Sequence, residues 1–305
     1  MPQPPTLFDD DHSDESAPAR SFKDRVRPPP RLPARNPEKE LVKLFEQLAY
    51  RHDKWKVFAD FCEMAAIAWS NRIDWAHYEK REARYLEIVK AYDRSEVELF
   101  PQILTHVVMA LEDDMTDVLG RVFHALELPN KYAGQYFTPD TLCRMMAAMT
   151  VGDGADIRER IARRGFVTAI EPAAGSGAMI IALAKAMTDA GINYQQHLHV
   201  TAVDKDPKCA HMAYVQFALL HIPAVVIHGD SLALKEYDHW YTPAHVMGGW
   251  VERLRHMRML DRMKELLTAP PAAEVRAPAN ISTETQSEEP AVTKPFASGP
   301  QLRLF

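Results

Sequence analysis

The stretch EPAAGSGAM, residues 171–179 of this 305-residue chain, predicts the point at which a strand turns into a helix. It follows FVTAI (166–170), an apolar run rich in β-branched residues, which is typical of a buried strand. It leads into AMIIALAKAMTDAG (178–191), which is typical of a helix. Gly175 and Gly177 let a ligand approach the backbone closely, so the turn is a candidate binding site.

The chain repeats this alternation of strand and helix after residue 191. HLHVTAV (197–203) and AVVIHGD (224–230) are predicted strands, and residues 204–222 between them are a predicted helix that Asp206 caps. Strands separated by helices form a parallel sheet with right-handed crossovers. The predicted fold class is therefore α/β.

Three acidic residues, Glu171, Asp204 and Asp230, end the three successive strands. In open α/β sheets, ligands bind at the carboxyl ends of the strands. A helix cap or a solvated loop would explain any one of these acids alone. Three of them at successive strand ends indicate a shared ligand.

The residues before the sheet are predicted to be helical. Apolar side chains recur at helical spacing in LVKLFEQL (41–48), WKVFADFCEMAAIAW (55–69) and MTDVLGRVFHAL (115–126). Residues 39–130 are therefore a predicted helical domain. Residues 131–268, which include predicted helices at 140–150 and 155–164, are the predicted sheet domain.

Both ends of the chain, residues 1–38 and 269–305, are rich in Pro, Ala, Ser, Thr and charged residues. Such segments cannot bury enough apolar surface to order themselves, so both are predicted to be disordered tails. The first residues lack the apolar core of a signal peptide. No run in the sequence is apolar for long enough to span a membrane.

The composition narrows the class of protein. A net charge of −6 argues against a wholly basic nucleic-acid-binding protein, although a local basic face remains open. The three cysteines, Cys62, Cys143 and Cys209, are far apart and form no CxxC pair, which argues against a zinc site and a disulfide framework. This cysteine usage predicts a cytoplasmic protein.

Three nucleotide-type ligands compete for the glycine turn. A P-loop needs Lys and then Ser or Thr after its last glycine, but Ala178 and Met179 follow Gly177. A dinucleotide site needs a third Gly or Ala, where this chain has Ile180. S-adenosylmethionine has no pyrophosphate, so less of its turn needs to bind phosphate.

The chemistry of S-adenosylmethionine suits the three acids. Asp204 can hold the ribose hydroxyls, because an ionised carboxylate accepts more than one hydrogen bond. Asp230 is placed to meet the adenine amino group. Glu171 can hold the ammonium of the aminoacid end, directly or through water. These residues favour S-adenosylmethionine as the cofactor.

A series of four motifs resembles that of the adenine-N6 DNA methyltransferases. The motifs are GQYFTPDTL (134–142), EPAAGSGAM, AVDKDP (202–207) and HGDSL (228–232). The order and spacing are most similar to those of the modification subunit of type I restriction–modification systems, which also carries a helical domain in front. The resemblance covers about residues 120–235. It implies a Rossmann-like S-adenosylmethionine-dependent methyltransferase sheet with DNA as substrate.

The resemblance also implies which positions face the cofactor. They are Gln135, Tyr136, Phe137, Thr138, Pro139, Glu171, Ala174, Gly175, Gly177, Asp204 and Asp230. Thr138 would supply a hydroxyl to the aminoacid end. The alternative for GQYFTP is a loop in which Thr138 or Asp140 caps the helix at 140–150.

The family's catalytic tetrapeptide, Asn or Asp followed by Pro-Pro and an aromatic residue, does not occur in this sequence. Weak catalytic candidates are the residues of WYTP, namely Trp240, Tyr241, Thr242 and Pro243. Residues 231–268 contain no clear apolar strand and are too few to complete a methyltransferase sheet. Either the sheet is truncated or another subunit completes it.

Two hypotheses for the function follow from the absence of this tetrapeptide. The first is a DNA adenine-N6 methyltransferase or its modification subunit. The second is a catalytically impaired protein that binds S-adenosylmethionine and DNA and acts as a regulator or decoy.

Two further features point to partners. Basic residues recur on two predicted helices, where they can meet DNA phosphates or form solvated faces: Arg158, Arg160, Arg163 and Arg164, then Arg253, Arg255, Arg258, Arg262 and Lys264. The last five residues, QLRLF, resemble the pentapeptide that binds the replication sliding clamp through Gln301, Leu302, Leu304 and Phe305. The alternative is an accidental apolar end on a frayed tail.

Overall fold

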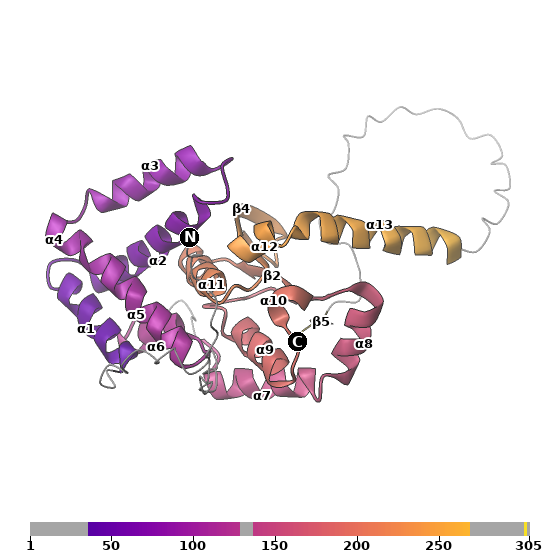
Figure 1. The fold of residues 1–305 in the computed structure, drawn as a ribbon. Coiled ribbons are helices and arrows are strands. Elements are labelled where there is room, and N and C mark those ends of the chain that lie inside the picture. Colours follow the sequence, from indigo (N-terminus) through magenta and orange to yellow (C-terminus); the bar gives the residue numbers. More distant parts are fainter. Residues whose placement is uncertain (1–35, 129–136, 269–301, 304–305) are drawn as a thin grey trace, which may run out of the picture. The chain divides into compact units, whose positions relative to one another are not determined.

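The computed structural model describes residues 36–128, 137–268 and 302–303 (Figure 1). The first part is helical, as predicted. Its helices are α1 (Pro37–Ala49), α2 (Lys54–Ser70), α3 (Tyr78–Val89), α4 (Arg94–Val97), α5 (Leu99–Asp113) and α6 (Val118–Ala125). Side-chain caps start several of them. Asn36 accepts hydrogen bonds from two backbone amides at the start of α1, and Asp53 accepts one at the start of α2.

The second part alternates helices and strands. Its elements up to the third strand are α7 (Asp140–Val151), α8 (Ala155–Arg164), β1 (Val167–Glu171), α9 (Ala178–Asp189), α10 (Tyr194–His197), β2 (Leu198–Asp204), α11 (Pro207–Leu219) and β3 (Ala224–Asp230). The three strands lie within one residue of their predicted bounds. An α/β fold with a parallel sheet is thus confirmed.

The sheet has the strand order β4-β3-β2-β1-β5. β1, β2 and β3 are parallel, with Val167 opposite Leu198 and Val200 opposite Ala224. Strand β5 (Leu302–Arg303) lies parallel to the outer edge of β1. The carboxyl ends of β1, β2 and β3 therefore meet at one edge of the sheet, which we call the carboxyl edge.

Strand β4 (Lys235–Tyr241) corrects the sequence analysis, which expected no strand after residue 230. It turns back from β3 and pairs with it antiparallel, at the opposite side of the sheet from β1. Six of its seven residues are exposed or only partly buried, so it has no continuous apolar run. An edge strand of this kind gives a weak signal in the sequence.

Two helices follow β4, namely α12 (Pro243–Met247) and α13 (Trp250–Thr268). Trp250 is buried, while most of the remaining residues of α13 are exposed. No helix in the described part of the chain has the length and apolar character that crossing a membrane requires.

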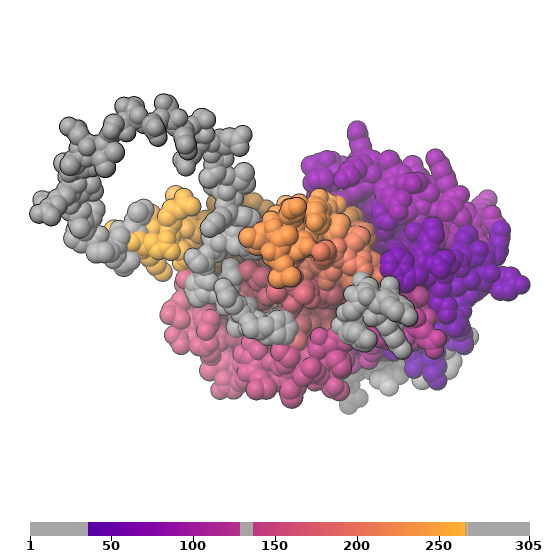
Figure 2. Space-filling model, turned by 180° about the vertical axis from the view of Figure 1, so that it is seen from behind, coloured from indigo at the N-terminus to yellow at the C-terminus, as the bar shows by residue number. Residues whose placement is uncertain are grey.

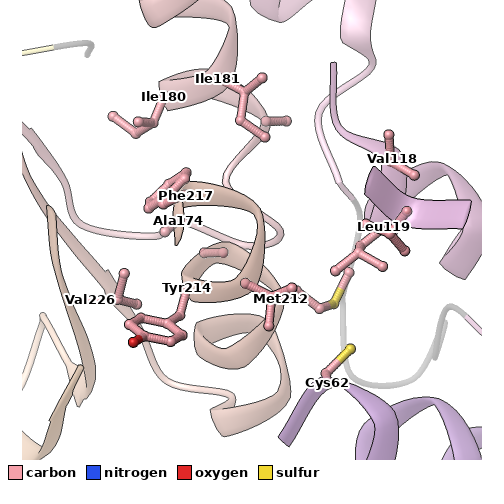
Figure 3. Packing of buried hydrophobic residues seen from close by; sticks show 14 of the residues in the cluster. Cys62, Val118, Leu119, Ala174, Ile180, Ile181, Met212, Tyr214, Phe217 and Val226 are labelled. Carbon is pink, nitrogen blue, oxygen red and sulfur yellow. The ribbon is translucent and has the colours of Figure 1, made fainter. Parts of the chain in front are cut away.

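The helical part and the sheet share one hydrophobic core. Figure 3 shows Cys62 of α2 and Leu119 of α6 on one side of Met212, which belongs to α11. Tyr214 and Phe217 of the same helix lie toward β3 and the glycine turn (Figure 3). Helix α11 therefore links the two predicted domains. Their predicted boundary at 130/131 lies outside the described residues, as do the predicted tails apart from residues 36–38 and 302–303.

Candidate functional site at the carboxyl edge of the sheet

The glycine turn between β1 and α9 requires glycine at two positions. Gly175 has φ +53° and Gly177 has φ +94°, which are values that favour glycine. A Cβ atom on Gly177 would lie 2.6 Å from the ring of Phe217. One on Gly175 would lie 3.1 Å from the ring of Phe137. The turn is held to β2 by Ala174, whose N–H donates to the carbonyl of Val203 over 2.8 Å.

Glu171 ends β1 beside this turn and is only 3% exposed. Its Oε1 accepts a hydrogen bond of 3.2 Å from the backbone N–H of Ala173, whereas its Oε2 has no partner among the described residues. Burial, together with the nearby charge of Asp204, raises the pKa of Glu171 to about 7. The carboxyl group is therefore poised between its two protonation states near neutral pH.

Asp204 ends β2 and joins the two loops of the carboxyl edge. Its Oδ2 accepts from the N–H of Gly175 over 2.7 Å, and its Oδ1 accepts from the N–H of Asp206 over 2.8 Å. Burial raises the pKa of Asp204, and the two backbone hydrogen bonds oppose that shift. Each carboxylate oxygen keeps a lone pair that a ligand hydroxyl can use.

Asp230 ends β3 and is held by its neighbours. Its Oδ1 accepts from the backbone N–H groups of Leu232 and Ala233. Lys205 lies 2.8 Å from Oδ2 and, with these amides, lowers the pKa of Asp230. The structure thus brings the three predicted acids to one edge, with Asp230 ionised at neutral pH.

The GQYFTP segment is described only from Phe137 onward, so Gln135 and Tyr136 lie outside the described residues. Phe137 lies over the glycine turn, with its ring 5.3 Å from that of Phe123. Thr138 and Pro139 are exposed.

The alternative role of this segment as a helix cap is not seen. Pro139 is the N-cap residue of α7 and makes no side-chain cap hydrogen bond. Asp140 instead accepts from the hydroxyl of Thr116 and from Arg144. Thr138 thus remains a candidate for contact with a ligand.

A buried network that the sequence analysis missed supports the turn. Asp117, the N-cap of α6, accepts from the backbone N–H of Gly120, from the hydroxyl of Ser176 and from the amide of Gln216. Gln216 also donates to the carbonyl of Ser176 over 2.8 Å and accepts from the N–H of Leu119 over 3.0 Å. Burial raises the pKa of Asp117. This network ties α6, the glycine turn and α11 together.

Lys208 is a second residue that sequence reasoning missed. It is 3% exposed, and its Nζ lies 3.2 Å from Asp206 and 3.9 Å from the centre of the Trp55 ring. Such a cation is stabilised by the carboxylate and by the aromatic face. Lys208 therefore fixes the loop that follows Asp204.

The weak catalytic candidates, the four WYTP residues, lie away from the carboxyl edge. Tyr241 pairs with Val225 near the amino end of β3, whereas Asp230 lies at its carboxyl end. Trp240 is buried against Tyr214, and Thr242 is fully buried and caps α12 together with the buried Pro243 at its first turn. Trp240, Thr242 and Pro243 are thus buried and Tyr241 is partly buried, all away from the carboxyl edge, so the geometry does not support a catalytic role for them.

The two basic helices lie together. Arg164 of α8 forms an ion pair of 3.0 Å with Asp261 of α13. In Figure 2 the yellow-orange end of α13 lies beside the pink surface that includes α8. Arg160, Arg163 and Arg255 each pair with an acid on their own helix. Arg158 and Arg253 instead donate to backbone carbonyls, those of Asp153 and Gln196.

Of the QLRLF motif, only Leu302 and Arg303 lie within the described residues, where they form β5. Gln301, Leu304 and Phe305 lie outside them.

Residues 112–255 match the family model described as N-6 DNA methylase. No curated protein matches the chain. A solved structure from Listeria monocytogenes, described as a class I S-adenosylmethionine-dependent methyltransferase, is similar with 13% sequence identity and a TM-score of 0.36, which is too low to establish a shared fold. The similarity covers 64% of this chain and 54% of that one, so the chain spans about half the length of that protein. The part of the chain that matches this family contains β1 to β4 and the three acids of the carboxyl edge.

Proposed function

We propose that this chain binds S-adenosylmethionine at the carboxyl edge and is the cofactor-binding part of an adenine-N6 DNA methyltransferase. Glu171 carries the proposal, because it is buried beside a glycine turn with one oxygen that has no partner among the described residues. A buried polar atom without a partner costs free energy, so its presence calls for an explanation such as a ligand group. The family match over residues 112–255 supports the same site.

The residues present fit this cofactor. Oε2 of Glu171 is available for the ammonium of the aminoacid end. Asp204 keeps lone pairs for the ribose hydroxyls, and the ionised Asp230 can accept from the adenine amino group. The bound cofactor supplies a methyl group that its sulfonium activates for transfer.

Other residues of the site position the cofactor and take no part in methyl transfer. Gly175 and Gly177 keep side chains out of the turn, so the cofactor can lie against its backbone. Phe137 covers the turn, and Thr138 is exposed next to it and can donate its hydroxyl to the aminoacid end. In this proposal the border of the site also includes Gln135, Tyr136, Pro139 and Ala174.

We assign DNA as the substrate class on the family match. The order of the sequence motifs suggests the type I modification subunit as the related architecture. The basic residues of α8 and α13 are candidates for contact with phosphates. Their ion pairs are mostly exposed and worth little, so phosphate can replace the acidic partners. Affinity for duplex DNA should then fall steeply with salt, and a flat response would exclude this contact.

A second function, binding of cofactor and DNA without turnover, is favoured by one specific observation. The sequence has no Asn/Asp-Pro-Pro-aromatic segment, and the WYTP residues lie away from the carboxyl edge. A protein of this kind would act as a regulator or decoy, or would need a second subunit to complete the sheet.

We also propose that the C-terminal pentapeptide binds a replication sliding clamp. Its apolar residues Leu302, Leu304 and Phe305 suit a groove on a partner. Since residues 302–303 pair with β1, clamp binding would require their release from the sheet. Deleting residues 301–305 should abolish clamp binding and leave cofactor binding intact. Clamp binding that survives the deletion would exclude this role.

Transfer of a labelled methyl group to adenine-rich duplex DNA separates the two functions. The purified chain is assayed for cofactor binding and for transfer under the same conditions. Binding with transfer supports the enzyme, and binding without transfer supports the second function. Absence of binding would contradict both.

A further inference from the structure

Lys208, near the start of α11, is a buried cation whose ammonium has no hydrogen-bond partner among the described residues. Its Nζ lies 3.2 Å from a carboxylate oxygen of Asp206. It also lies over two aromatic rings, 3.9 Å from the centre of the Trp55 ring and 4.8 Å from that of Phe123. Burying a charge costs free energy unless the charge is paired and hydrogen-bonded, so a lysine at this position calls for an explanation.

One path of contacts leads from Lys208 to Asp204 through Asp206. Oδ1 of Asp206 accepts from the backbone N–H of Lys208 over 2.9 Å, and Oδ2 pairs with Nζ. Lys208 thus contacts both oxygens of this carboxylate. The backbone N–H of Asp206 in turn donates to Oδ1 of Asp204 over 2.8 Å. The position of Asp206 therefore affects the orientation of the Asp204 carboxylate.

A second path leads from Lys208 to Asp204 through aromatic rings. The Phe123 ring under Nζ has its centre 5.3 Å from that of Phe137. Phe137 lies over Gly175, because a Cβ atom there would be 3.1 Å from the Phe137 ring. The N–H of Gly175 donates to Oδ2 of Asp204 over 2.7 Å. The two paths therefore end on the two oxygens of one carboxylate.

We infer that Lys208 is a positioning residue for the cofactor, which holds Asp204 in the orientation that the ribose hydroxyls require. This inference rests on the proposed function for the identity of the ligand. Side chains that bind a ligand are held in their productive geometry by the packing and the hydrogen bonds around them. Lys208 supplies this support from below the site, through Asp206 and Phe123. Because Trp55 and Phe123 belong to α2 and α6, the helical part of the chain takes part in cofactor binding.

The alternative is that Lys208 stabilises the fold without affecting the orientation of Asp204. Lys208→Met separates the two roles, because methionine keeps an unbranched side chain and removes the charge. The change leaves no buried carboxylate unpaired, since the Asp206 side chain is 21% exposed and keeps its hydrogen bond to the backbone N–H at position 208.

The test is a double-mutant cycle on the full chain, in which calorimetry measures the dissociation constant of S-adenosylmethionine. The four proteins are the wild type, Lys208→Met, Asp204→Ala and the double variant. Lys208→Met should weaken binding about fivefold in the wild type and less than about twofold in Asp204→Ala, because Lys208 acts through Asp204. Lys43→Met is the control and should leave the affinity unchanged, because Lys43 is an exposed residue of α1 that pairs with Glu40.

Asp206→Asn is a second variant, which keeps a side-chain oxygen at the start of α11 and removes the charge that pairs with Lys208. It should weaken binding in the same pattern, and it decides the question if urea denaturation shows that Lys208→Met does not fold. Wild-type affinity in the folded variants would overturn the inference. An equal loss in the wild type and in Asp204→Ala would also overturn it, since Lys208 would then act on the structure in general. No binding by the wild type would overturn the proposed function as well, so the two failures are distinguishable.

Discussion

Glu171 combines burial, an oxygen without a described partner and a pKa raised to about 7. A cationic group prefers the ionised carboxylate, and the ionised fraction grows as the pH rises through about 7. Affinity for S-adenosylmethionine should therefore increase between pH 6 and pH 8, with proton release on binding. Calorimetry in two buffers of different ionisation enthalpy measures this. Glu171→Gln should abolish the pH dependence, and an equal dependence in the variant would assign it to another group.

Asp117 accepts three hydrogen bonds that tie the glycine turn to α6 and α11. In Asp117→Asn, one of the two oxygens becomes an amide that cannot accept, so buried donors lose their partner. The free energy of unfolding should fall by about 1–3 kcal/mol, as measured by urea denaturation. Asp114→Asn is the matched control, because the Asp114 side chain is 46% exposed. Equal effects of the two changes would show that the network does not stabilise the turn.

The buried residues His199 and His245 predict how the free energy of unfolding changes at acidic pH. The two rings are joined by a hydrogen bond of 2.9 Å, and burial lowers the pKa of His199 to about 3 and that of His245 to about 4. Both are neutral in the folded state, whereas the unfolded chain binds protons below about pH 6.5. Their contribution to stability is therefore present above about pH 6.5 and is lost as the pH falls toward 4.

Urea midpoints at pH 5 and pH 7 measure this effect. His199→Phe should reduce the difference between the two midpoints, since one titrating group is removed. His256→Phe is the control, because His256 is exposed. A difference that His199→Phe leaves unchanged would contradict the assignment to this pair.

At the level of elements, the turn between β1 and α9 depends on both backbone conformation and space. Gly177→Ala places a methyl group against Phe217 at a residue with φ +94°. Gly165→Ala is the control, because its φ is +84° and no atom lies within 4 Å of the added Cβ. Both changes should cost about 1–2 kcal/mol of backbone strain. Gly177→Ala should cost about 1–3 kcal/mol more through overpacking, as measured by urea denaturation. Equal losses would show that Phe217 moves aside freely.

The elements also show what the sequence could and could not predict. β1, β2 and β3 are buried apolar runs bounded by turns, so their ends and the three acids there were predictable. β4 is an exposed edge strand of charged and aromatic residues, which lacks that signal. The contact of Gln216 with Asp117 joins residues 99 positions apart, so it depends on tertiary packing that the sequence pattern does not show.

For the molecule as a whole, the central proposal is that the carboxyl edge of β1, β2 and β3 holds S-adenosylmethionine. The helices α2 and α6 pack on α11 and so support this edge, within one core. The carboxyl edge is therefore formed by the ends of three strands and two loops, and the buried network around Asp117 supports it.

Calorimetry with S-adenosylmethionine on the wild type and on Asp204→Ala tests that claim most directly. The change removes the acceptor for the ribose hydroxyls and for the N–H of Gly175. Asp156→Ala, at an exposed acid of α8, is the control, and circular dichroism confirms that all three proteins fold. Asp204→Ala should weaken binding at least about tenfold, which corresponds to about 1.4 kcal/mol. Wild-type affinity in Asp204→Ala, or no binding by the wild type, would contradict the account.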